Sequence, residues 1–440
     1  MQISGWGQYP IVDATISQAH SKRKVSELLQ TWTTDEESNP PQLIARGLGR
    51  SYGDSALAPH VLQTHHLNHF VEFNPMTGDI TCSAGISFAE ILELFVPRGW
   101  FLPVTPGTKF VTVGGAIASD VHGKNHHIDG CFSQHVSSLQ IALATGEIVS
   151  CSPSEKPELF HATCGGMGLT GVIVQASFRL IAIESAFISE QTFKTANLKE
   201  TLELFEEHEP STYSVAWIDC LATGDKLGRS LLMLGEHTSS GELQAHKDRK
   251  LNVPVNMPSL LLNPYSIQAF NTLYYHKQTQ QHSIRDVHYE PFFYPLDGIQ
   301  NWNRLYGKKG FTQYQFVLPK SAGLEGMTRI LQEIAKSKRG SFLAVLKAFG
   351  KGNDNLLSFP TEGYTLALDF KIDDKLFSFL DELDRIVLDY GGRLYLTKDV
   401  RMSEATFKQS YPNWEQFQAV RHQYGADQHF HSLQSKRLGL

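Results

Sequence analysis

The chain has 440 residues, of which 41% are hydrophobic, so it is long and apolar enough for about two or three domains with their own cores. Charged residues make up 19%, with 39 basic against 45 acidic side chains and a net charge of −6, which excludes a largely disordered chain and leaves no general footprint for nucleic acid. The sequence has neither an apolar run of the ~20 residues that span a membrane nor the basic, apolar start of a secretory signal, so we expect a cytoplasmic protein.

The first part of the chain alternates short strands, glycine turns and helices. Residues 41–49 predict a strand that enters a glycine turn. Residues 79–99 predict strand, turn and helix, with the capping-box pair Ser87 and Glu90 at the start of the helix and Gly99 at its end. Alternating apolar residues predict a hairpin over residues 138–153 and one unbroken strand over residues 171–183.

A second part, poorer in glycine clusters, begins after residue 183. It predicts strands over residues 312–319 and 363–372 and amphipathic helices over residues 323–337 and 375–392. From about residue 391 the sequence is again rich in glycine and basic residues, as in the first part. We therefore expect an α+β protein of two domains rather than a doubly wound sheet: residues 1–183 completed by 392–440, and an insertion over 184–391.

Cysteines and histidines give no metal site. The five cysteines are scattered without a C-x-x-C pair, which argues against a disulfide framework and a structural zinc site and favours buried, reduced thiols. Residues 121–127 (VHGKNHH) place three histidines beside a lysine, but no carboxylate or cysteine stands at convincing ligand spacing. His122 is either a catalytic or substrate-orienting group or a histidine held structurally in a tight turn.

Glycine is concentrated in three segments, each next to a predicted strand. They are residues 46–54 (RGLGRSYGD), 104–123 and 165–171 (GGMGLTG). Glycines let a ligand approach backbone N–H groups, and a run of such groups attracts anions. The spacing matches neither the G-x-G-x-x-G fingerprint nor a G-x-x-x-x-G-K-[ST] loop. Together the three segments indicate a large, flat ligand wrapped by the backbone.

The order of these motifs resembles a known superfamily. The segments that carry the resemblance are ARGLGRSYGDSA, TPGTKFVTVGGAIASDVHGKNHH, GGMGLTGVI, HYEPFFYPLD, QYQFVLP, GGRLYLTKDVRMS and SKRLGL, which run from residue 45 to 440. They resemble the FAD-binding oxidases whose FAD domain is named after p-cresol methylhydroxylase (PCMH) and vanillyl-alcohol oxidase, and within them the decaprenylphosphoryl-β-D-ribose 2′-oxidase family. The resemblance implies a two-domain vanillyl-alcohol-oxidase-like fold, with an FAD-binding PCMH-type domain and an α+β substrate (cap) domain that contains an antiparallel sheet.

The resemblance also implies FAD contacts, which agree with the small-residue segments. They fall on Ala45, Arg46, Gly47, Leu48, Gly49, Arg50, Ser51, Tyr52, Gly53, Asp54, Ser55, Gly107, Thr112, Val113, Gly114, Gly115, Ser119, Asp120, Val121, His122, Ile173 and Tyr395. In covalent relatives a histidine of the first glycine loop bonds the flavin. That loop contains no histidine here, so we expect non-covalent FAD.

For the chemistry, the resemblance implies three groups beside the flavin and sugar: Lys398, Tyr52 and His122. Lys398 would stabilise the anionic reduced flavin, orient the sugar hydroxyl or, with a lowered pKa, act as a base. Without the resemblance, the simplest interpretation of Lys398 is a surface lysine paired with Asp399.

The implied substrate pocket consists of Trp217, Gln313, Gln315, Lys347 and Thr365. Lys347 would meet a phosphate as a point charge. Ala367 stands where the mycobacterial-type enzymes carry a cysteine, and Thr365 replaces an amide side chain, so the identity of the substrate is less certain than the flavin chemistry.

Residues 251–275 are unusually apolar around Leu260, Leu261 and Leu262. They form either a core helix of the second domain or a flap that touches a membrane or a polyprenyl chain. A flap would make the protein peripheral at the inner face of the membrane.

The resemblance implies an FAD-dependent oxidoreductase that oxidises a ring hydroxyl of a polyprenyl-phosphate pentose. A separate NAD(P)H-dependent short-chain reductase would act on the keto product. Two alternatives remain: a soluble sugar-lactone or alditol oxidase that uses oxygen, and a flavin-binding protein that has lost turnover. Neither a metal nor nucleic acid is expected.

Overall fold

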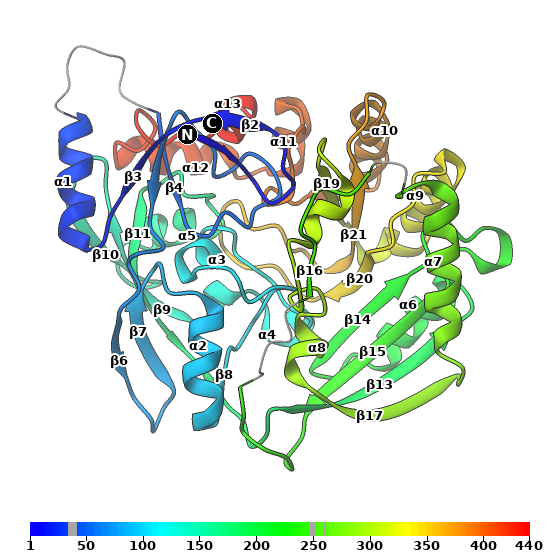
Figure 1. The fold of residues 1–440 in the computed structure, drawn as a ribbon. Helices are drawn as coiled ribbons and strands as arrows, with labels where there is room; N and C mark the ends of the chain where they lie inside the picture. Colours follow the sequence, from blue (N-terminus) through cyan, green and yellow to red (C-terminus); the bar gives the residue numbers. More distant parts are fainter. Residues whose placement is uncertain (34–41, 246–250, 259–260) are drawn as a thin grey trace.

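The computed structural model describes residues 1–33, 42–245, 251–258 and 261–440. Strands and helices mix along the whole chain, which confirms the expected α+β class (Figure 1). Within the described residues, the main sheets have three, five and eight strands. The helices and the smaller pairs of strands pack around these three sheets.

The first 182 residues form the small parallel sheet and the five-stranded antiparallel sheet (Figure 1). Their strands are β1 (Gln2–Ser4), β2 (Ile11–Asp13), β3 (Thr15–Gln18), β4 (Leu43–Arg46), β5 (His60–Gln63), β6 (Phe70–Phe73), β7 (Asp79–Ser83), β8 (Trp100–Phe101), β9 (Val136–Ala142), β10 (Ile148–Cys151), β11 (Val172–Arg179) and β12 (Ile181–Ala182). Their helices are α1 (Lys22–Thr33), α2 (Phe88–Phe95), α3 (Val113–Ala118), α4 (His126–Asp129) and α5 (Pro157–Thr163). The parallel sheet has the order β3-β5-β4, and the antiparallel sheet has the order β10-β9-β11-β7-β6.

Two local predictions for this part are confirmed and one is wrong. Ser87 and Glu90 close the capping box of α2, and β9 pairs with β10 as a hairpin. The strand predicted over residues 171–183 is divided at Leu180. The Leu180 N–H donates to the Gly78 carbonyl over 2.9 Å, and the chain then leaves the five-stranded sheet to pair β12 with β8.

The rest of the chain builds the eight-stranded sheet and the last helices. The strands are β13 (Phe187–Thr195), β14 (Tyr213–Ile218), β15 (Ser230–His237), β16 (Leu251–Asn252), β17 (His282–His288), β18 (Ile299–Gln300), β19 (Phe311–Pro319), β20 (Ala344–Phe349), β21 (Gly363–Lys371) and β22 (Arg393–Leu394). The helices are α6 (Leu198–Glu207), α7 (Pro264–Lys277), α8 (Tyr289–Phe293), α9 (Gly323–Ser337), α10 (Leu376–Asp389), α11 (Glu404–Ser410), α12 (Trp414–Gln423) and α13 (Leu433–Arg437). The sheet order is β17-β13-β15-β14-β20-β21-β19-β22, with antiparallel pairing throughout.

Side-chain alternation gives the eight-stranded sheet two different faces. On β19, Tyr314 and Phe316 belong to the hydrophobic core that includes residues of α9 and α10, whereas Gln313 and Gln315 point the other way. On β20, Leu346 belongs to the same core. The helices therefore cover one apolar face, and the opposite face is partly polar although it is buried.

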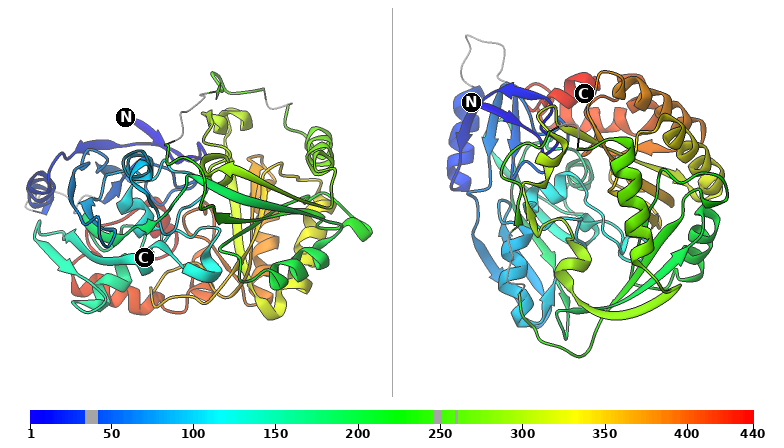
Figure 2. Two further views of the ribbon diagram at one scale, coloured as in Figure 1. Left: turned by 90° about the horizontal axis from the view of Figure 1, so that it is seen from below. Right: turned by 45° about the vertical axis from the view of Figure 1, so that its right-hand side comes forward.

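The end of the chain returns to the first part. Both views show the last helices, in red, beside the blue and cyan segments (Figure 2). The Tyr52 N–H donates to the Thr397 carbonyl over 3.1 Å, and the Leu433 N–H donates to the Leu57 carbonyl over 2.8 Å. Helix α12 packs against α5. The five cysteines are free and buried, as expected.

The apolar segment around residue 261 differs from a core helix. Leu260 lies outside the described residues, and Leu261 is 56% exposed. Helix α7 begins only at Pro264, after the capping residue Asn263, and Asn271 is its one buried residue. Leu262 is partly buried and packs against the cluster of Trp302, Tyr306 and Phe311, so part of the segment touches a core although helix α7 itself is not a buried core helix. No described helix is long and apolar enough to cross a membrane.

Candidate active site

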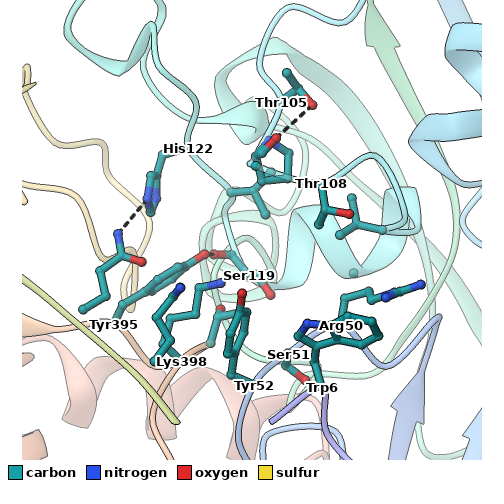
Figure 3. A pocket seen from close by; sticks show the side chains of 18 of the residues that line it. Trp6, Arg50, Ser51, Tyr52, Thr105, Thr108, Ser119, His122, Tyr395 and Lys398 are labelled. Atoms are coloured by element: carbon teal, nitrogen blue, oxygen red, sulfur yellow. Dashed lines mark hydrogen bonds between the residues drawn. The ribbon is translucent and has the colours of Figure 1, made fainter. Parts of the chain in front are cut away.

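A cavity of about 390 Å³ lies between the glycine-rich segments of the first part and the polar face of the eight-stranded sheet. This volume is within the ~300–1,000 Å³ range of ligand sites. Much of its wall comes from the first glycine loop, residues 105–124, strands β14, β19 and β20, and residues 395–398 (Figure 3). Residues 167–173 and 293–297 also contribute.

The first glycine loop forms a cradle of backbone donors at one end of the cavity. The N–H groups of Leu48, Gly49, Arg50 and Ser51 donate no hydrogen bond to any residue that the structure describes. Gly49 has φ +63°, a conformation that glycine adopts without strain. A Cβ on Gly53 would lie 1.8 Å from the Asp399 carbonyl oxygen, so the loop sits directly on the returning chain. Consecutive free N–H groups of this kind suit a pyrophosphate.

Arg50 adds a cation beside the cradle. Its guanidinium carbon lies 4.1 Å from the ring centroid of Trp6 and 5.4 Å from that of Phe110 (Figure 3). Its Nε is buried and has no hydrogen-bond partner among the described residues. A buried, unpartnered cation next to free N–H groups is chemically suited to an anionic group. The cradle and Arg50 therefore fit the diphosphate of FAD.

Most of the predicted cofactor contacts line the cavity. The lining residues among them are Ala45, Gly47, Leu48, Gly49, Arg50, Ser51, Tyr52, Ser55, Gly107, Thr112, Gly114, Gly115, Ser119, Val121, His122, Ile173 and Tyr395. The Tyr395 hydroxyl donates to the Ser119 carbonyl over 2.8 Å, which joins the returning chain to the wall opposite the cradle. The actual contacts with FAD stay a prediction.

Five predicted cofactor contacts do not line the cavity but support its walls. They are Arg46, Gly53, Asp54, Val113 and Asp120. Arg46 donates to the carbonyl groups of Ser4 and Ala56, and Val113 is part of the apolar core. These residues support the loops from behind, Gly53 through its close backbone approach to Asp399, and a motif match does not distinguish such support from direct contact.

Asp54 and Asp120 are the two acidic members of this group. Asp54 forms an ion pair with Arg437 at 2.8 Å. Asp120 accepts hydrogen bonds from Asn353, Asn355 and Ser358 at 2.6–2.9 Å. Neither carboxylate therefore faces the cradle, where it would repel a diphosphate.

Lys398 and Tyr52 lie side by side on the cavity wall (Figure 3). The Lys398 Nζ is 3.9 Å from the centroid of the Tyr52 ring. Burial lowers the pKa of Lys398 to about 8, and the charge of Asp369 offsets part of this effect. Asp399 instead pairs with Arg437 at 3.0 Å, so the interpretation of Lys398 as a surface lysine paired with Asp399 is wrong.

Asp369 is a buried carboxylate that the sequence analysis missed. It accepts a hydrogen bond from the Gln313 amide over 2.6 Å and one from the Tyr306 hydroxyl over 3.3 Å. Burial raises its pKa to about 7, while Gln313 and the charge of Lys398 lower it. Alternation along β21 would have placed Asp369 on the same face as Thr365 and Ala367. Asp369 fixes the Gln313 side chain through this hydrogen bond. Its negative charge is also the one that raises the pKa of Lys398.

His122 is a neutral histidine, and one of its two ring nitrogens has a hydrogen-bond partner. Its Nε2 accepts a hydrogen bond from the Gln315 amide over 3.1 Å, and its Nδ1 has no partner among the described residues (Figure 3). Burial and the nearby charge of Lys347 hold its pKa well below the usual value. With Nε2 as acceptor, the proton lies on Nδ1, which is itself buried.

The rings of His122 and His126 lie 6.4 Å apart, but the two neighbouring histidines have other main contacts. His127 Nε2 contacts the Ser211 carbonyl over 2.8 Å, and His126 packs against Phe349 with ring centroids 4.5 Å apart. Across the described ranges, no group of three or more His, Cys, Asp or Glu side chains is arranged to hold a metal ion.

The predicted substrate pocket is largely assembled. Trp217, Gln313, Gln315 and Lys347 line the cavity, and the Trp217 indole N–H donates to the Phe342 carbonyl over 3.1 Å. Thr365 does not line it: its hydroxyl donates to the Phe316 carbonyl and accepts from Gln315 at 3.3 Å. The lining residues that sequence reasoning missed include Trp6, Lys124, Met233, Tyr274, Asp297 and Trp302.

Comparison with known proteins agrees with this geometry. The profile of the FAD binding domain family matches residues 17–152. The decaprenylphosphoryl-beta-D-ribose oxidase of Mycolicibacterium smegmatis is 36% identical over 454 aligned residues, which cover 100% of this chain and 97% of the relative.

Two further relatives share only part of the chain. The D-arabinono-1,4-lactone oxidase of Yarrowia lipolytica is 34% identical over 35% of this chain and 30% of its own length. The human Delta(24)-sterol reductase is 33% identical over 22% of this chain and 19% of its own length. Full-length similarity to one relative and an assembled cradle for FAD lead to one conclusion: the chain belongs to the FAD-dependent oxidoreductase family of the decaprenylphosphoryl-β-D-ribose oxidases.

Proposed function

We propose that this protein oxidises a ring hydroxyl of a pentose carried on a polyprenyl phosphate and passes the hydride to FAD. The observation that carries the proposal is one cavity lined both by the glycine loop, whose N–H groups have no partner among the described residues, and by Lys398, Tyr52 and the polar face of the eight-stranded sheet. Oxidation of an alcohol needs both a hydride acceptor and a proton acceptor. Bound FAD supplies the hydride acceptor.

Lys398 is the residue best suited to take the hydroxyl proton. A pKa of about 8 leaves part of the Lys398 amines neutral near neutral pH. His122 already uses its Nε2 lone pair to accept from Gln315, so this lone pair is not free to take the hydroxyl proton. Once protonated, the Lys398 ammonium lies beside the negative charge that the hydride brings to the cofactor. Tyr52 holds the Lys398 amine over its ring.

Asp369 acts through Lys398 and Gln313 as a positioning residue. Replacing it by asparagine removes the charge that raises the pKa of Lys398, so this pKa falls below about 8. The rate of flavin reduction rises with pH as Lys398 loses its proton. In Asp369→Asn we therefore expect this rise about 1 pH unit lower. The plateau is also expected to fall, because the ammonium loses its counter-charge.

The pH dependence of anaerobic flavin reduction checks this prediction. Asp374→Asn, which changes an exposed carboxylate paired with Lys309, is the matched control and should keep the wild-type profile. If the rate of flavin reduction rises at the same pH in Asp369→Asn as in the wild type, a group other than Lys398 controls this pH dependence.

The reaction is best tested with a substrate panel. Purified protein with FAD is mixed anaerobically with free pentoses, sugar lactones, alditols and polyprenyl-phosphoribose, and loss of the oxidised flavin absorbance is followed. We expect bleaching by polyprenyl-phosphoribose. Bleaching by a lactone or an alditol alone would favour the alternative of a soluble oxidase that uses oxygen. That alternative has less support, because the lactone oxidase aligns with only 35% of the chain. No bleaching by any compound would favour a flavin-binding protein without turnover.

FAD is proposed to bind without a covalent bond. The loop of residues 46–54 contains no histidine or cysteine. His122, which lines the cavity, accepts a hydrogen bond from Gln315 at Nε2. Acid precipitation should therefore release intact FAD into the supernatant. Flavin that remains with the precipitated polypeptide would contradict this prediction.

We further propose that the chain folds as two units with FAD held between them. Residues 1–183 with 392–440 would form the FAD unit, and residues 184–391 the substrate unit. Three contacts support the discontinuous FAD unit: Tyr52 with Thr397, Leu57 with Leu433, and Asp54 with Arg437. The returning segment also contacts the substrate unit: β22 pairs with β19 at Val317 and Arg393, and Arg401 forms an ion pair with Asp384 of α10.

The same proposal includes a peripheral contact with the membrane through α7. Its exposed apolar residues are Tyr265 at 82%, Leu273 at 73% and Phe270 at 42% exposure. On the same helix, Tyr274 lines the cavity and contacts Trp217, with the two ring centroids 4.7 Å apart. An aromatic path therefore leads from the cavity to this apolar face, which suits a polyprenyl chain.

The double substitution Tyr265→Ser and Leu273→Ser tests the membrane contact. We expect weaker co-sedimentation with anionic liposomes and an unchanged flavin spectrum, because both side chains point away from the cavity. Unchanged co-sedimentation would contradict the contact. The keto product requires a partner that adds a hydride to a ketone, and we propose a separate NAD(P)H-dependent short-chain reductase for this step.

A further inference from the structure

Lys124 is a half-buried lysine that the sequence analysis did not assign to the site. It follows the wall residues His122 and Gly123 and lines the cavity. Its Nζ donates to the Phe292 carbonyl over 2.6 Å and lies 4.1 Å from the centroid of the Phe292 ring. Its own carbonyl accepts from the Ser214 N–H over 2.9 Å, which ties it to β14.

Lys347 approaches the same place from β20. Alternation along the strand buries Leu346 in the core and turns Val345 and Lys347 toward the cavity. Strand β14 pairs antiparallel with β20 through Ala216 with Leu346 and Trp217 with Val345. Continuing this register brings the start of β14, which holds the Lys124 backbone, alongside Lys347. Both side chains line the cavity, and the charge of Lys124 acts on Lys347 although the two residues come from different parts of the fold.

No carboxylate neutralises this pair. Neither lysine forms an ion pair with any residue that the structure describes. Within the described lining, Asp297 is the one carboxylate, and its charge acts on Arg50 and Tyr52. Glu190, outside the lining, acts on Lys124 but is itself paired with Arg285 at 2.6 Å. The rest of this wall is apolar, with Val215, Trp217 and Val345.

Burial lowers the pKa of both lysines, and repulsion by neighbouring lysines adds to this effect at Lys347. The pKa of Lys347 is lowered to about 7 by burial and by the charges of Lys124 and Lys398. Burial lowers the pKa of Lys124 to about 8. Two adjacent cations without a counter-ion are unfavourable inside a protein, and an anion between them would remove this cost.

We propose that Lys124 and Lys347 form an anion subsite that holds the phosphodiester of the substrate. This inference rests on the proposed function and deepens it. With the phosphodiester at this wall, the pentose lies between the lysine pair and Lys398, and the apolar chain continues past Trp217 and Tyr274 toward α7. The subsite selects phosphorylated pentoses over free ones, since only they carry the anion.

The test compares two substrates in four proteins. A short-chain prenylphosphoryl-ribose carries the anion, and methyl β-D-ribofuranoside does not. For each, kcat/KM for anaerobic flavin reduction is measured in wild type, Lys124→Gln, Lys347→Gln and the control Lys308→Gln, which changes an exposed lysine. We expect the preference for the phosphorylated substrate to fall about 10- to 100-fold in both subsite variants, chiefly through KM. Lys347→Arg should restore part of it.

Three results would overturn the subsite. The first is an equal loss of kcat/KM for both substrates, which would indicate a structural role. The second is an unchanged preference. The third is loss of FAD from the variants with an unchanged preference, which would assign the lysines to the cofactor diphosphate instead of the substrate.

Inorganic phosphate and pyrophosphate separate the subsite from the reaction itself. Either anion is expected to perturb the flavin spectrum of the wild-type holoenzyme and to do so more weakly in Lys124→Gln and Lys347→Gln. This readout needs no turnover. A holoenzyme that oxidises neither pentose but binds phosphate through these lysines would refute the proposed function and keep the subsite. The absence of any phosphate effect in the wild type would refute the subsite alone.

Discussion

Replacement of Lys398 by methionine is expected to leave FAD bound and to slow the reduction of flavin by substrate about 10²- to 10⁴-fold. Methionine keeps much of the side-chain volume over the Tyr52 ring but has no proton acceptor and no charge. The hydroxyl proton then has no acceptor, since His122 Nε2 is already occupied by Gln315. Stopped-flow measurement of anaerobic flavin bleaching reports this step directly.

The exposed Lys308→Met serves as the control and should reduce flavin at the wild-type rate. Flavin content, measured after release by acid, must be equal in the two variants and the wild type. A rate in Lys398→Met within about twofold of wild type would remove Lys398 from the chemistry.

Replacement of Arg437 by glutamine is expected to destabilise the fold by about 3–5 kcal/mol and to release FAD. Arg437 forms ion pairs with Asp54 at 2.8 Å and Asp399 at 3.0 Å, and both carboxylates are buried. Without Arg437 these charges stay unpaired directly behind the glycine cradle and behind Lys398. Urea unfolding gives the loss of stability, and equilibrium dialysis gives the retention of FAD.

Arg329→Gln is a matched surface control, because its pair with Asp389 is long, at 3.7 Å, and half exposed. We expect it to change stability by less than about 1 kcal/mol. If Arg437→Gln had the same free energy of unfolding and the same FAD retention as Arg329→Gln, the closing segment would not belong to the FAD unit.

The glycine segments could be predicted from the sequence because their chemistry is local. Runs such as residues 46–54 carry conformational freedom and small size in the residues themselves, and the structure places them on one cavity. The capping box of α2 and the hairpin of β9 and β10 are equally local signals.

The polar partners of the site could not be predicted in the same way. Asp369 meets Gln313 through pairing of β21 with β19, and Lys124 meets Lys347 through β14 and β20. Such pairs depend on strand order and register, which a single sequence does not show. The resemblance likewise marks residues near a cofactor without distinguishing those that line the cavity, such as Gly49, from those that support it, such as Asp120.

The central claim is that a hydride leaves a ring carbon of a phosphorylated pentose for FAD in this cavity. A single-turnover, anaerobic comparison of prenylphosphoryl-ribose with the same compound carrying deuterium at ring carbon 2 tests it most directly. The account predicts slower flavin bleaching with the deuterated substrate and a keto sugar as the product. Equal rates at saturating substrate together with a product other than a keto sugar would contradict it.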